Sequence, residues 1–224
     1  MTRIETVVLD MAGTTVVDDG IVLDAFARAW DELAPGGVER EDAIAHVIAT
    51  MGQSKIEVFR VLVDEDAAQQ LNEHFERALA DVVREDRVTA IPGAADAIRR
   101  LQADGRDVVL TTGFSRATAD AIVAELGWQH LPAAVLTPAD AGRGRPAPDL
   151  NLLAALRTQV SAVAAVAVVG DTESDARSGV RAGAGLVVGV RTGGVADDAL
   201  RAAGAMEVID AVTELPGLLQ RLGR

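Results

Sequence analysis

The first residue with clear chemical potential is Asp10, which directly follows the apolar run Val7-Val8-Leu9. Small and hydroxyl residues come next, in the order Ala12-Gly13-Thr14-Thr15. Such an apolar run indicates a buried strand, and in open α/β sheets ligands bind beyond the carboxyl ends of the strands. Asp10 therefore has the place of a nucleophile or a metal ligand, although an aspartate after a strand also serves as a turn or helix-capping residue.

Three later segments place polar residues after a predicted strand in the same way. The turn Thr111-Thr112-Gly113 offers hydroxyls and backbone amides ahead of a helix, an arrangement that binds anions. A proline-braced loop presents Arg145, and a further turn carries Asp171 and Asp175. Each segment alone has an ordinary structural explanation, but together they supply carboxylates, phosphate-binding groups and a cation. The set predicts a pocket for Mg²⁺ and a phosphoryl group.

The composition restricts the class of partner. The chain has 224 residues and a formal net charge of -13, whereas nucleic-acid-binding proteins show a basic footprint. It contains no cysteine, which excludes disulfides, thiolate metal sites and cysteine nucleophiles. No basic and apolar leader precedes the first strand, and no apolar run reaches the length of a membrane span. We therefore expect a cytoplasmic globular protein with no nucleic acid and no membrane as partner.

Strands and helices alternate along most of the chain, and the exception is a helical stretch after the first strand. Residues 18–88 carry apolar side chains at helical spacing and give no strand signal, which predicts an inserted bundle of helices. Elsewhere the pattern predicts short parallel strands separated by helices, at residues 6–10, 107–111, 133–137, 164–169, 185–190 and 207–209. The expected fold class is α/β, a Rossmann-like parallel-sheet core domain (residues 1–17 and 89–224) with an inserted all-helical cap domain (residues 18–88).

Together the four segments resemble the motifs of the haloacid dehalogenase superfamily, whose members mostly transfer phosphoryl groups through an aspartate. The resemblance spans the whole chain, including a helical cap between the first and second motifs. It implies that Asp10 is the nucleophile and that Arg145, in place of the usual lysine, balances the charge of Asp10 and the phosphoryl group. It also implies a Mg²⁺ site made by Asp10, the carbonyl of Ala12 and Asp171, with Asp175 as a ligand or as the holder of a metal-bound water.

The same resemblance assigns the phosphate-binding residues. Thr111 would hold the phosphoryl oxygens, with Thr112 as its neighbour or substitute, because the register of the second motif is ambiguous by one residue. The remaining residues assigned to the substrate lie in the first motif, the second motif and the cap, and they are Ala12, Gly13, Thr14, Gly113, Met51 and Gly52.

The residue two places after the nucleophile departs from the common phosphatase pattern. Phosphatases of the superfamily carry an aspartate there, which protonates the leaving group and later activates water, and this chain has Ala12. A general acid or base is worth roughly 10² to 10⁴ in rate. The phosphonatases (phosphonoacetaldehyde hydrolases) tolerate alanine, because a cap lysine forms a Schiff base with the aldehyde and the electrons of the C–P bond leave into an enamine. Their lysine lies in a Met-Gly-x-x-Lys segment, and this chain has Met51-Gly52-Gln53-Ser54-Lys55.

Lys55 is the residue that separates the alternatives. It is the only lysine in the chain, and arginine, which supplies the other basic side chains, cannot form an imine. The plain alternative is a surface lysine at the start of a helix. Three other positions differ from the phosphonatases, with Val58 in place of a histidine, Phe114 in place of a tyrosine and Ile21 in place of a cysteine. The resemblance implies a phosphonatase-like enzyme that acts on phosphonoacetaldehyde or a related small phosphonate.

Two other functions stay open. A small-molecule phosphomonoesterase, acting on phosphoglycolate or a sugar phosphate, would need another group in place of the missing acid. A non-catalytic phosphate-binding module would explain Ala12 but not the retained motif carboxylates. Dinucleotide binding is excluded, because no Gly-x-Gly-x-x-Gly follows the first strand. In the cap, which is expected to hinge near residues 16–19 and 88–92, Phe26 and Trp30 share one face that forms either a homodimer interface or the core of the cap.

Overall fold

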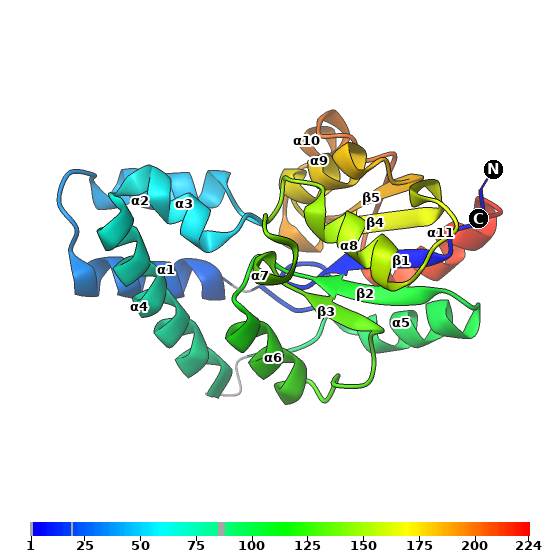
Figure 1. The fold of residues 1–224 in the computed structure, drawn as a ribbon, viewed down its shortest axis with the longest axis horizontal. Coiled ribbons are helices and arrows are strands. Elements are labelled where there is room, and N and C mark those ends of the chain that lie inside the picture. The colour runs from blue at the N-terminus through cyan, green and yellow to red at the C-terminus, as the bar shows by residue number, and fades with distance from the viewer. Residues whose placement is uncertain (1, 19, 85–87) are drawn as a thin grey trace.

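The computed structural model describes residues 2–18, 20–84 and 88–224, and at its centre lies a parallel six-stranded sheet (Figure 1). The strands are β1 (Thr6–Asp10), β2 (Asp107–Thr111), β3 (Ala134–Leu136), β4 (Val166–Gly170), β5 (Leu186–Val190) and β6 (Glu207–Ile209). Their order is β3-β2-β1-β4-β5-β6, so β1 lies in the middle of the sheet. The order reverses between β1 and β4, and ligands bind at the carboxyl ends of the strands beside such a reversal. Asp10 ends β1 at this place.

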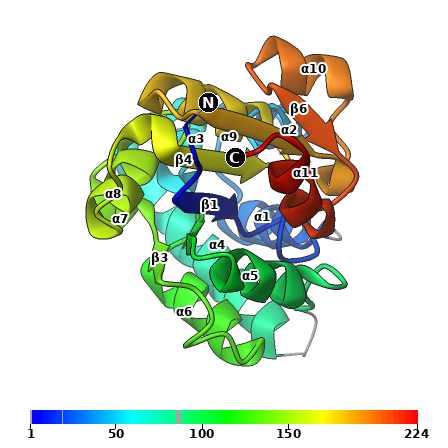
Figure 2. The same ribbon diagram turned by 90° about the vertical axis from the view of Figure 1, so that its right-hand side faces the viewer.

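Helices cover both faces of the sheet (Figure 2). One face carries α5 (Ala94–Ala103), α6 (Arg116–Glu125) and α11 (Leu215–Arg221), and the other carries α8 (Asp149–Arg157), α9 (Glu173–Ala182) and α10 (Asp197–Ala202). The short helix α7 (Pro138–Ala141) precedes α8. Neighbouring residues such as Val7 and Val8 are buried in opposite layers, which explains the consecutive apolar residues of the strands. The predicted α/β fold class is confirmed.

The strand bounds agree closely with the predicted ranges. β1, β2 and β6 have the predicted bounds, whereas β3 and β5 are slightly shorter than predicted. The prediction of a strand from residue 164 is wrong, because Val163–Ala165 form a short 3₁₀ helix in which the N–H of Ala165 bonds back to the carbonyl of Ala162 at 2.8 Å. β4 therefore begins at Val166 and continues to Gly170.

Four helices follow β1, as predicted for the cap: α1 (Ile21–Leu33), α2 (Arg40–Ala49), α3 (Lys55–Leu62) and α4 (Glu65–Arg84). Figure 1 shows them beside the sheet as a separate bundle. Their apolar faces meet at the buried rings of Phe26, Phe59 and Phe75, whose successive centroids are 5.6 Å apart. Trp30 packs on Phe26 at 5.5 Å. Phe26 and Trp30 are therefore core of the cap, and the alternative in which they form a dimer interface is wrong.

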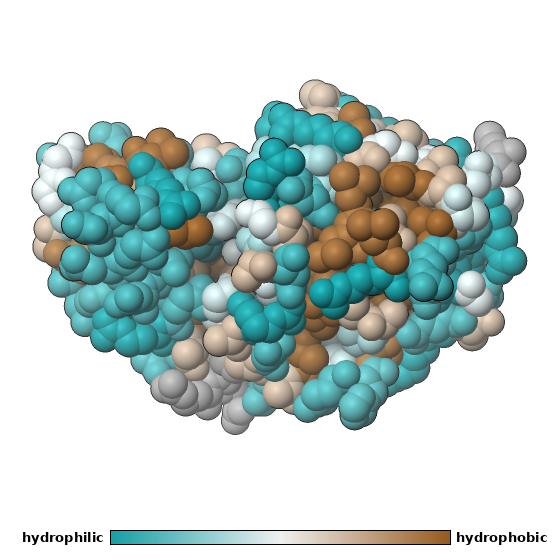
Figure 3. Space-filling view, in the orientation of Figure 1, coloured by the Kyte–Doolittle hydropathy of each residue, from teal (hydrophilic) through white to brown (hydrophobic). Residues whose placement is uncertain are grey.

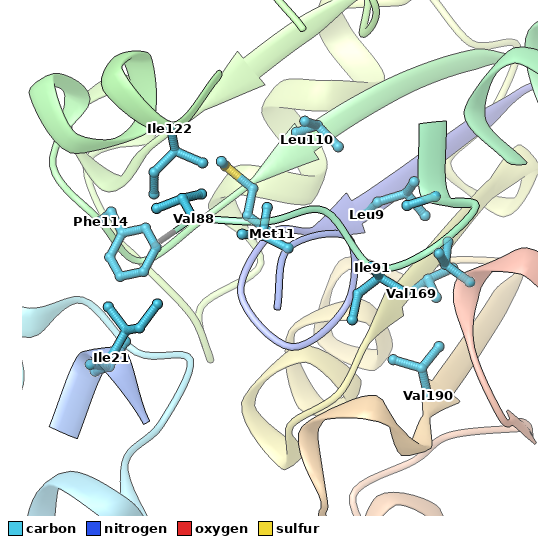
Figure 4. Packing of buried hydrophobic residues seen from close by; sticks show 14 of the residues in the cluster. Leu9, Met11, Ile21, Val88, Ile91, Leu110, Phe114, Ile122, Val169 and Val190 are labelled. Atoms are coloured by element: carbon cyan, nitrogen blue, oxygen red, sulfur yellow. The ribbon is translucent and has the colours of Figure 1, made fainter. Parts of the chain in front are cut away.

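The two linkers between cap and core run side by side. The N–H of Val17 donates to the carbonyl of Thr89, and the N–H of Ile91 donates to the carbonyl of Thr15, both at 2.9 Å. The predicted hinges lie here, but Asp19 and residues 85–87 are outside the described residues. The domain bounds at 17/18 and 88/89 stay predictions. Figure 4 shows apolar side chains packed around the linkers, among them Met11, Ile21, Val88, Phe114 and Ile122.

In the view of Figure 3 the cap surface is mostly hydrophilic, and hydrophobic residues gather over α8 of the core. Leu152 and Leu156 of that helix are among the exposed large apolar side chains. No helix within the described ranges is long and apolar enough to cross a membrane. In this view the larger hydrophobic patch therefore lies on the core, and smaller hydrophobic spots lie on the cap.

Candidate active site

Asp10 and Arg145 form a buried ion pair at the carboxyl end of β1. The Nη1 atom of Arg145 lies 2.5 Å from Oδ1 of Asp10, and both side chains are 4% exposed. Arg145 comes from the loop between α7 and α8, and the same Nη1 atom also contacts the carboxylate of Asp175. The structure thus brings together the predicted nucleophile and the predicted counter-charge. One guanidinium serves two carboxylates here.

Asp171 is held beside Asp10 by the first-motif turn. It follows β4, and its Oδ1 accepts a hydrogen bond from the hydroxyl of Thr14 at 2.9 Å. Gly13 and Gly193 both press on this carboxylate, since a Cβ atom added at either position would collide with Asp171 Oδ2. Gly193 was missed in the sequence, where its only signal is its place just after a predicted strand. Thr14 and Gly13 thus act on the carboxylate of Asp171 in this structure.

Asp175 lies in the first turn of α9, and both of its carboxylate oxygens have partners. Its Oδ2 accepts from the N–H of Thr172 at 3.1 Å, and its own N–H donates to the hydroxyl of Thr172 at 3.3 Å, which makes a capping box. Its Oδ1 contacts Arg145. These contacts fix the Asp175 carboxylate beside Asp10, and its two predicted roles, as a metal ligand or as the holder of a metal-bound water, stay predictions.

The carboxylates crowd one another, and burial raises the pKa of Asp10 to about 7. Arg145 lowers that pKa and the charge of Asp175 raises it. The pKa of Asp171 is raised well above its ordinary value by burial and then by the negative charges of Asp10 and Asp175. Each of the three aspartates offers one oxygen, and these oxygens lie within 4.8 Å of one another. Excess negative charge with an all-oxygen donor set fits a hard divalent cation such as Mg²⁺.

The second-motif turn meets the site through Thr112 rather than Thr111. Thr111 is the last residue of β2, pairs with Asp10 across the two strands and is buried. Thr112 and Gly113 line the cavity beside Asp10, whereas Thr111 is not among the lining residues. The Thr112 hydroxyl also accepts from the N–H of Phe114 at 3.2 Å, which closes the turn. The strand ends before the cavity is reached, so the alternative register of this motif agrees better with the structure.

The cap segment Met51–Lys55 sits on the core turns. A Cβ atom on Gly113 would lie 2.5 Å from the carbonyl oxygen of Gln53, and one on Gly144 would lie 2.9 Å from Cβ of Ser54. A Cβ atom on Gly52 would lie 2.5 Å from the hydroxyl oxygen of Thr172. Cap and core therefore touch at three turns, and the cap is closed over the site.

Lys55 is the first residue of α3 and faces the same cavity as Asp10. It is only 5% exposed, so the reading of Lys55 as a surface residue is wrong. Burial lowers the pKa of Lys55 from 10.5 to about 8; the charge of Arg145 lowers it further, and Asp18 and Asp10 oppose the change. Neutral amine is thus accessible near physiological pH, as a nucleophilic lysine requires.

The cavity is small in this closed structure, with a volume of about 30 Å³, which is room for only one or two water molecules. Apolar walls come from Ala12, Val22, Met51 and Phe114. Val58 and Ile21 are buried but do not line this cavity. Asp18, which sequence reasoning did not select, does line it. Its only sequence signal is its place between the first motif and the first cap helix.

Comparisons with known proteins agree with this geometry. The profile of the haloacid dehalogenase-like hydrolase family matches residues 4–183. A phosphonoacetaldehyde hydrolase from Bacillus cytotoxicus is 30% identical over 208 residues, which cover 84% of this chain and 77% of that protein. A phosphonoacetaldehyde hydrolase like protein from Oleispira antarctica has a similar structure, with a TM-score of 0.83 and 26% identity over 99% of this chain and 93% of that one. A hydrolase from Pseudomonas syringae shares the fold, with a TM-score of 0.86 and 22% identity over 97% of this chain and 99% of that one.

Proposed function

Because the chain belongs to the haloacid dehalogenase-like hydrolases, and within them to the phosphonoacetaldehyde hydrolase-like branch, we propose that it cleaves the C–P bond of phosphonoacetaldehyde or a closely related small phosphonate. The observation that carries the proposal is the burial of the single lysine, Lys55, in one cavity with Asp10 and Arg145. Imine formation with an aldehyde needs a nucleophilic amine, whereas hydrolysis of a phosphate ester does not require one.

The phosphoryl end of the substrate lies against the core in this proposal. Mg²⁺ bound by Asp10, the carbonyl of Ala12 and Asp171 would add positive charge next to the phosphoryl oxygens. Arg145 balances the remaining negative charge, and Thr112 with the Gly113 backbone receives the outer oxygens. Asp10 attacks phosphorus and forms an aspartyl phosphate, which water later hydrolyses to phosphate.

The aldehyde end lies against Lys55. The neutral amine adds to the carbonyl carbon, and loss of water gives an imine on Lys55. When the C–P bond breaks, its electron pair passes into the enamine, so no free carbanion forms and no acid is needed at position 12. The closed cap excludes bulk water, which would otherwise compete for the imine.

Trapping on Lys55 tests the amine half of the proposal. Wild-type protein with phosphonoacetaldehyde and borohydride is expected to gain one covalent adduct, which mass spectrometry places on Lys55. Lys55→Arg keeps the positive charge and is expected to form no adduct and to lose turnover. Full activity of Lys55→Arg on phosphonoacetaldehyde would exclude imine chemistry.

Asp10→Asn tests the nucleophile half. It is expected to abolish release of phosphate while leaving the folded structure intact, because Asn fills the same space beside Arg145. Retained turnover in this variant would contradict the assignment of Asp10. Hydrolysis of phosphoglycolate or sugar phosphates by wild type, with no action on phosphonates, would favour the phosphomonoesterase alternative. Binding of vanadate without turnover on either class would favour a non-catalytic module.

A further inference from the structure

Imine chemistry at Lys55 needs a group that moves protons, and the structure supplies one candidate. Among the described residues that line the cavity, five have ionisable side chains: Asp10, Asp18, Lys55, Arg145 and Asp171. Asp10 and Asp171 already have other roles in the proposed function, as the nucleophile and as a metal ligand. Arginine does not release its proton in proteins. This leaves the carboxyl group of Asp18.

We propose that Asp18 is the proton-transfer residue for imine formation and breakdown at Lys55, an inference that rests on the proposed function. Asp18 stands in the linker between β1 and α1, directly after Val17, whose N–H is tied to Thr89. It is half-buried, and its Oδ1 is out of contact with solvent. It therefore reaches the cavity from a fixed stretch of linker, while Lys55 enters from the cap.

The position that follows Lys55 by one helical turn cannot do this work. Val58 is 2% exposed, has no ionisable group and does not line the cavity. The walls near the linker are also apolar, with Val22 and Phe114 among them. In Figure 4 the ring of Phe114 lies close to Ile21 at the start of α1. Asp18 is thus a carboxyl group set among apolar walls within electrostatic reach of the amine, and its charge favours the protonated form of Lys55.

Asp18 can carry the protons of the proposed steps. As the amine of Lys55 adds to the aldehyde, the π pair of the carbonyl moves to oxygen, which takes the proton of the acid form of Asp18. The carboxylate of Asp18 then accepts one of the two protons of the positively charged nitrogen, which gives a neutral carbinolamine. The acid form gives that proton to the departing hydroxyl, so the C–O bond breaks with loss of water and the C=N bond of the iminium forms, with Asp18 left as a carboxylate.

The same group serves the second half of the reaction. After the phosphoryl group has moved to Asp10, the carboxylate of Asp18 takes up a proton from solvent, and the acid form gives it to the enamine carbon, which makes an iminium. Water then adds to that iminium, and Asp18 accepts a proton from the water. The acid form gives this proton to the nitrogen and the carboxylate takes one from the hydroxyl, so the C–N bond breaks to release the aldehyde and the free amine. Hydrolysis of the aspartyl phosphate returns the proton taken from solvent, so no oxidant, reductant or further reactant is needed.

Reductive trapping of acetaldehyde measures the imine steps without the C–P step. Wild type, Asp18→Asn, Asp18→Ala and the exposed cap control Asp42→Asn are incubated with acetaldehyde and cyanoborohydride, and the modification of Lys55 is followed by mass spectrometry. We expect both Asp18 variants to be trapped roughly 10² to 10⁴ times more slowly, as for loss of a general acid or base, and Asp42→Asn to match wild type. We also expect formate, a carboxylate small enough to enter the vacated space, to speed the trapping of Asp18→Ala.

The outcomes separate this inference from its alternatives. If Asp18 acted only through its charge, its loss would leave Lys55 more often neutral, and trapping would become faster instead of slower. Trapping of Asp18→Asn within threefold of wild type overturns the proposal. Slow trapping of Asp18→Ala that formate does not restore also overturns it, since that result marks a structural role. If wild type itself forms no adduct with either aldehyde, the proposed function is wrong. If wild type is trapped and the Asp18 variants are trapped equally well, the proposed function stands and only the role of Asp18 is wrong.

Discussion

Replacing Lys55 by methionine is expected to make the protein more stable and inactive at the same time. The ammonium group of Lys55 is buried in a cavity whose fixed neighbours only partly offset the loss of water, and its pKa falls from 10.5 to about 8. Methionine has a similar length and no charge to bury. The variant removes the amine that the proposed chemistry needs, and it also removes the unfavourable free energy of burying a charged group.

The size of the effect follows from the pKa. A tenfold change in proton affinity corresponds to about 1.4 kcal/mol, so a folded-state pKa of about 8 against 10.5 makes the protonated form about 3 kcal/mol less favourable in the folded protein. Below pH 8 both the folded and the unfolded chain carry the proton, and folding bears the whole cost. Between pH 8 and pH 10.5 the unfolded chain binds more protons than the folded one, so the stability of wild type rises with pH. The advantage of Lys55→Met is therefore largest at neutral pH and disappears above about pH 10.5.

Denaturant unfolding of wild type, Lys55→Met and Lys55→Arg at pH 7, 9 and 10.5 measures this directly. Lys55→Met is expected to gain about 3 kcal/mol at pH 7 and progressively less at higher pH. Lys55→Arg is the matched control, because arginine stays protonated throughout this range and is expected to show no such gain. Equal stability of Lys55→Met and wild type at pH 7, or an advantage that does not shrink with pH, would refute the reasoning.

Three further perturbations address the cap and the metal. Gly113→Ala places a methyl group 2.5 Å from the carbonyl oxygen of Gln53, so the cap should fail to close and kcat/KM should fall at least tenfold. The control is Gly36→Ala, whose methyl group meets no atom within 4 Å and which should leave kcat/KM unchanged. Glu76 on α4 accepts hydrogen bonds from the hydroxyls of Ser115 and Thr118 on the core. Glu76→Ala should therefore weaken the docking of the cap by roughly 1 to 3 kcal/mol, which hydrogen exchange would detect as faster exchange of the α4 amides. Unchanged exchange would show that this contact does not hold the cap. Chelation by EDTA should abolish phosphate release, and added Mg²⁺ should restore it and raise the Tm, because a cation offsets the repulsion among the buried aspartates; activity that survives exhaustive chelation would contradict a metal-dependent reaction.

Most of the fold, and most of the site on the core, could be predicted from the apolar runs and from the polar residues that follow them. Asp10 and Asp171 converge because parallel strands end at one edge of a sheet, which can be inferred from the sequence once the strands are found, and Arg145 joins them from the loop between α7 and α8. The sequence did not predict the end of every strand to the residue. Whether Thr111 or Thr112 meets the cavity depends on where β2 ends, and a pattern of apolar residues does not resolve a single position.

Contacts between distant segments were harder to infer. The burial of Lys55 depends on how the cap docks, and nothing near Lys55 in the sequence encodes the turns at Gly113 and Gly144 that receive it. Asp18 and Gly193 were missed for the same reason. Asp18 shares the cavity with Lys55, more than thirty-five positions along the chain, and Gly193 lies against Asp171, more than twenty positions along the chain. Phe26 and Trp30 were ambiguous because an apolar helical face looks the same whether it meets a partner or its own bundle.

The way the Met51–Lys55 segment rests on three core turns has a consequence for the timing of the reaction. Gly52, Gln53 and Ser54 touch three separate core segments, which follow β4, follow β2 and join α7 to α8, so the amine reaches its place only when all three are correctly formed. A core that has not yet ordered its phosphate-binding turns cannot receive the cap. In the proposed reaction the amine of Lys55 would therefore be placed beside Asp10 only on a core whose phosphate-binding turns are already folded.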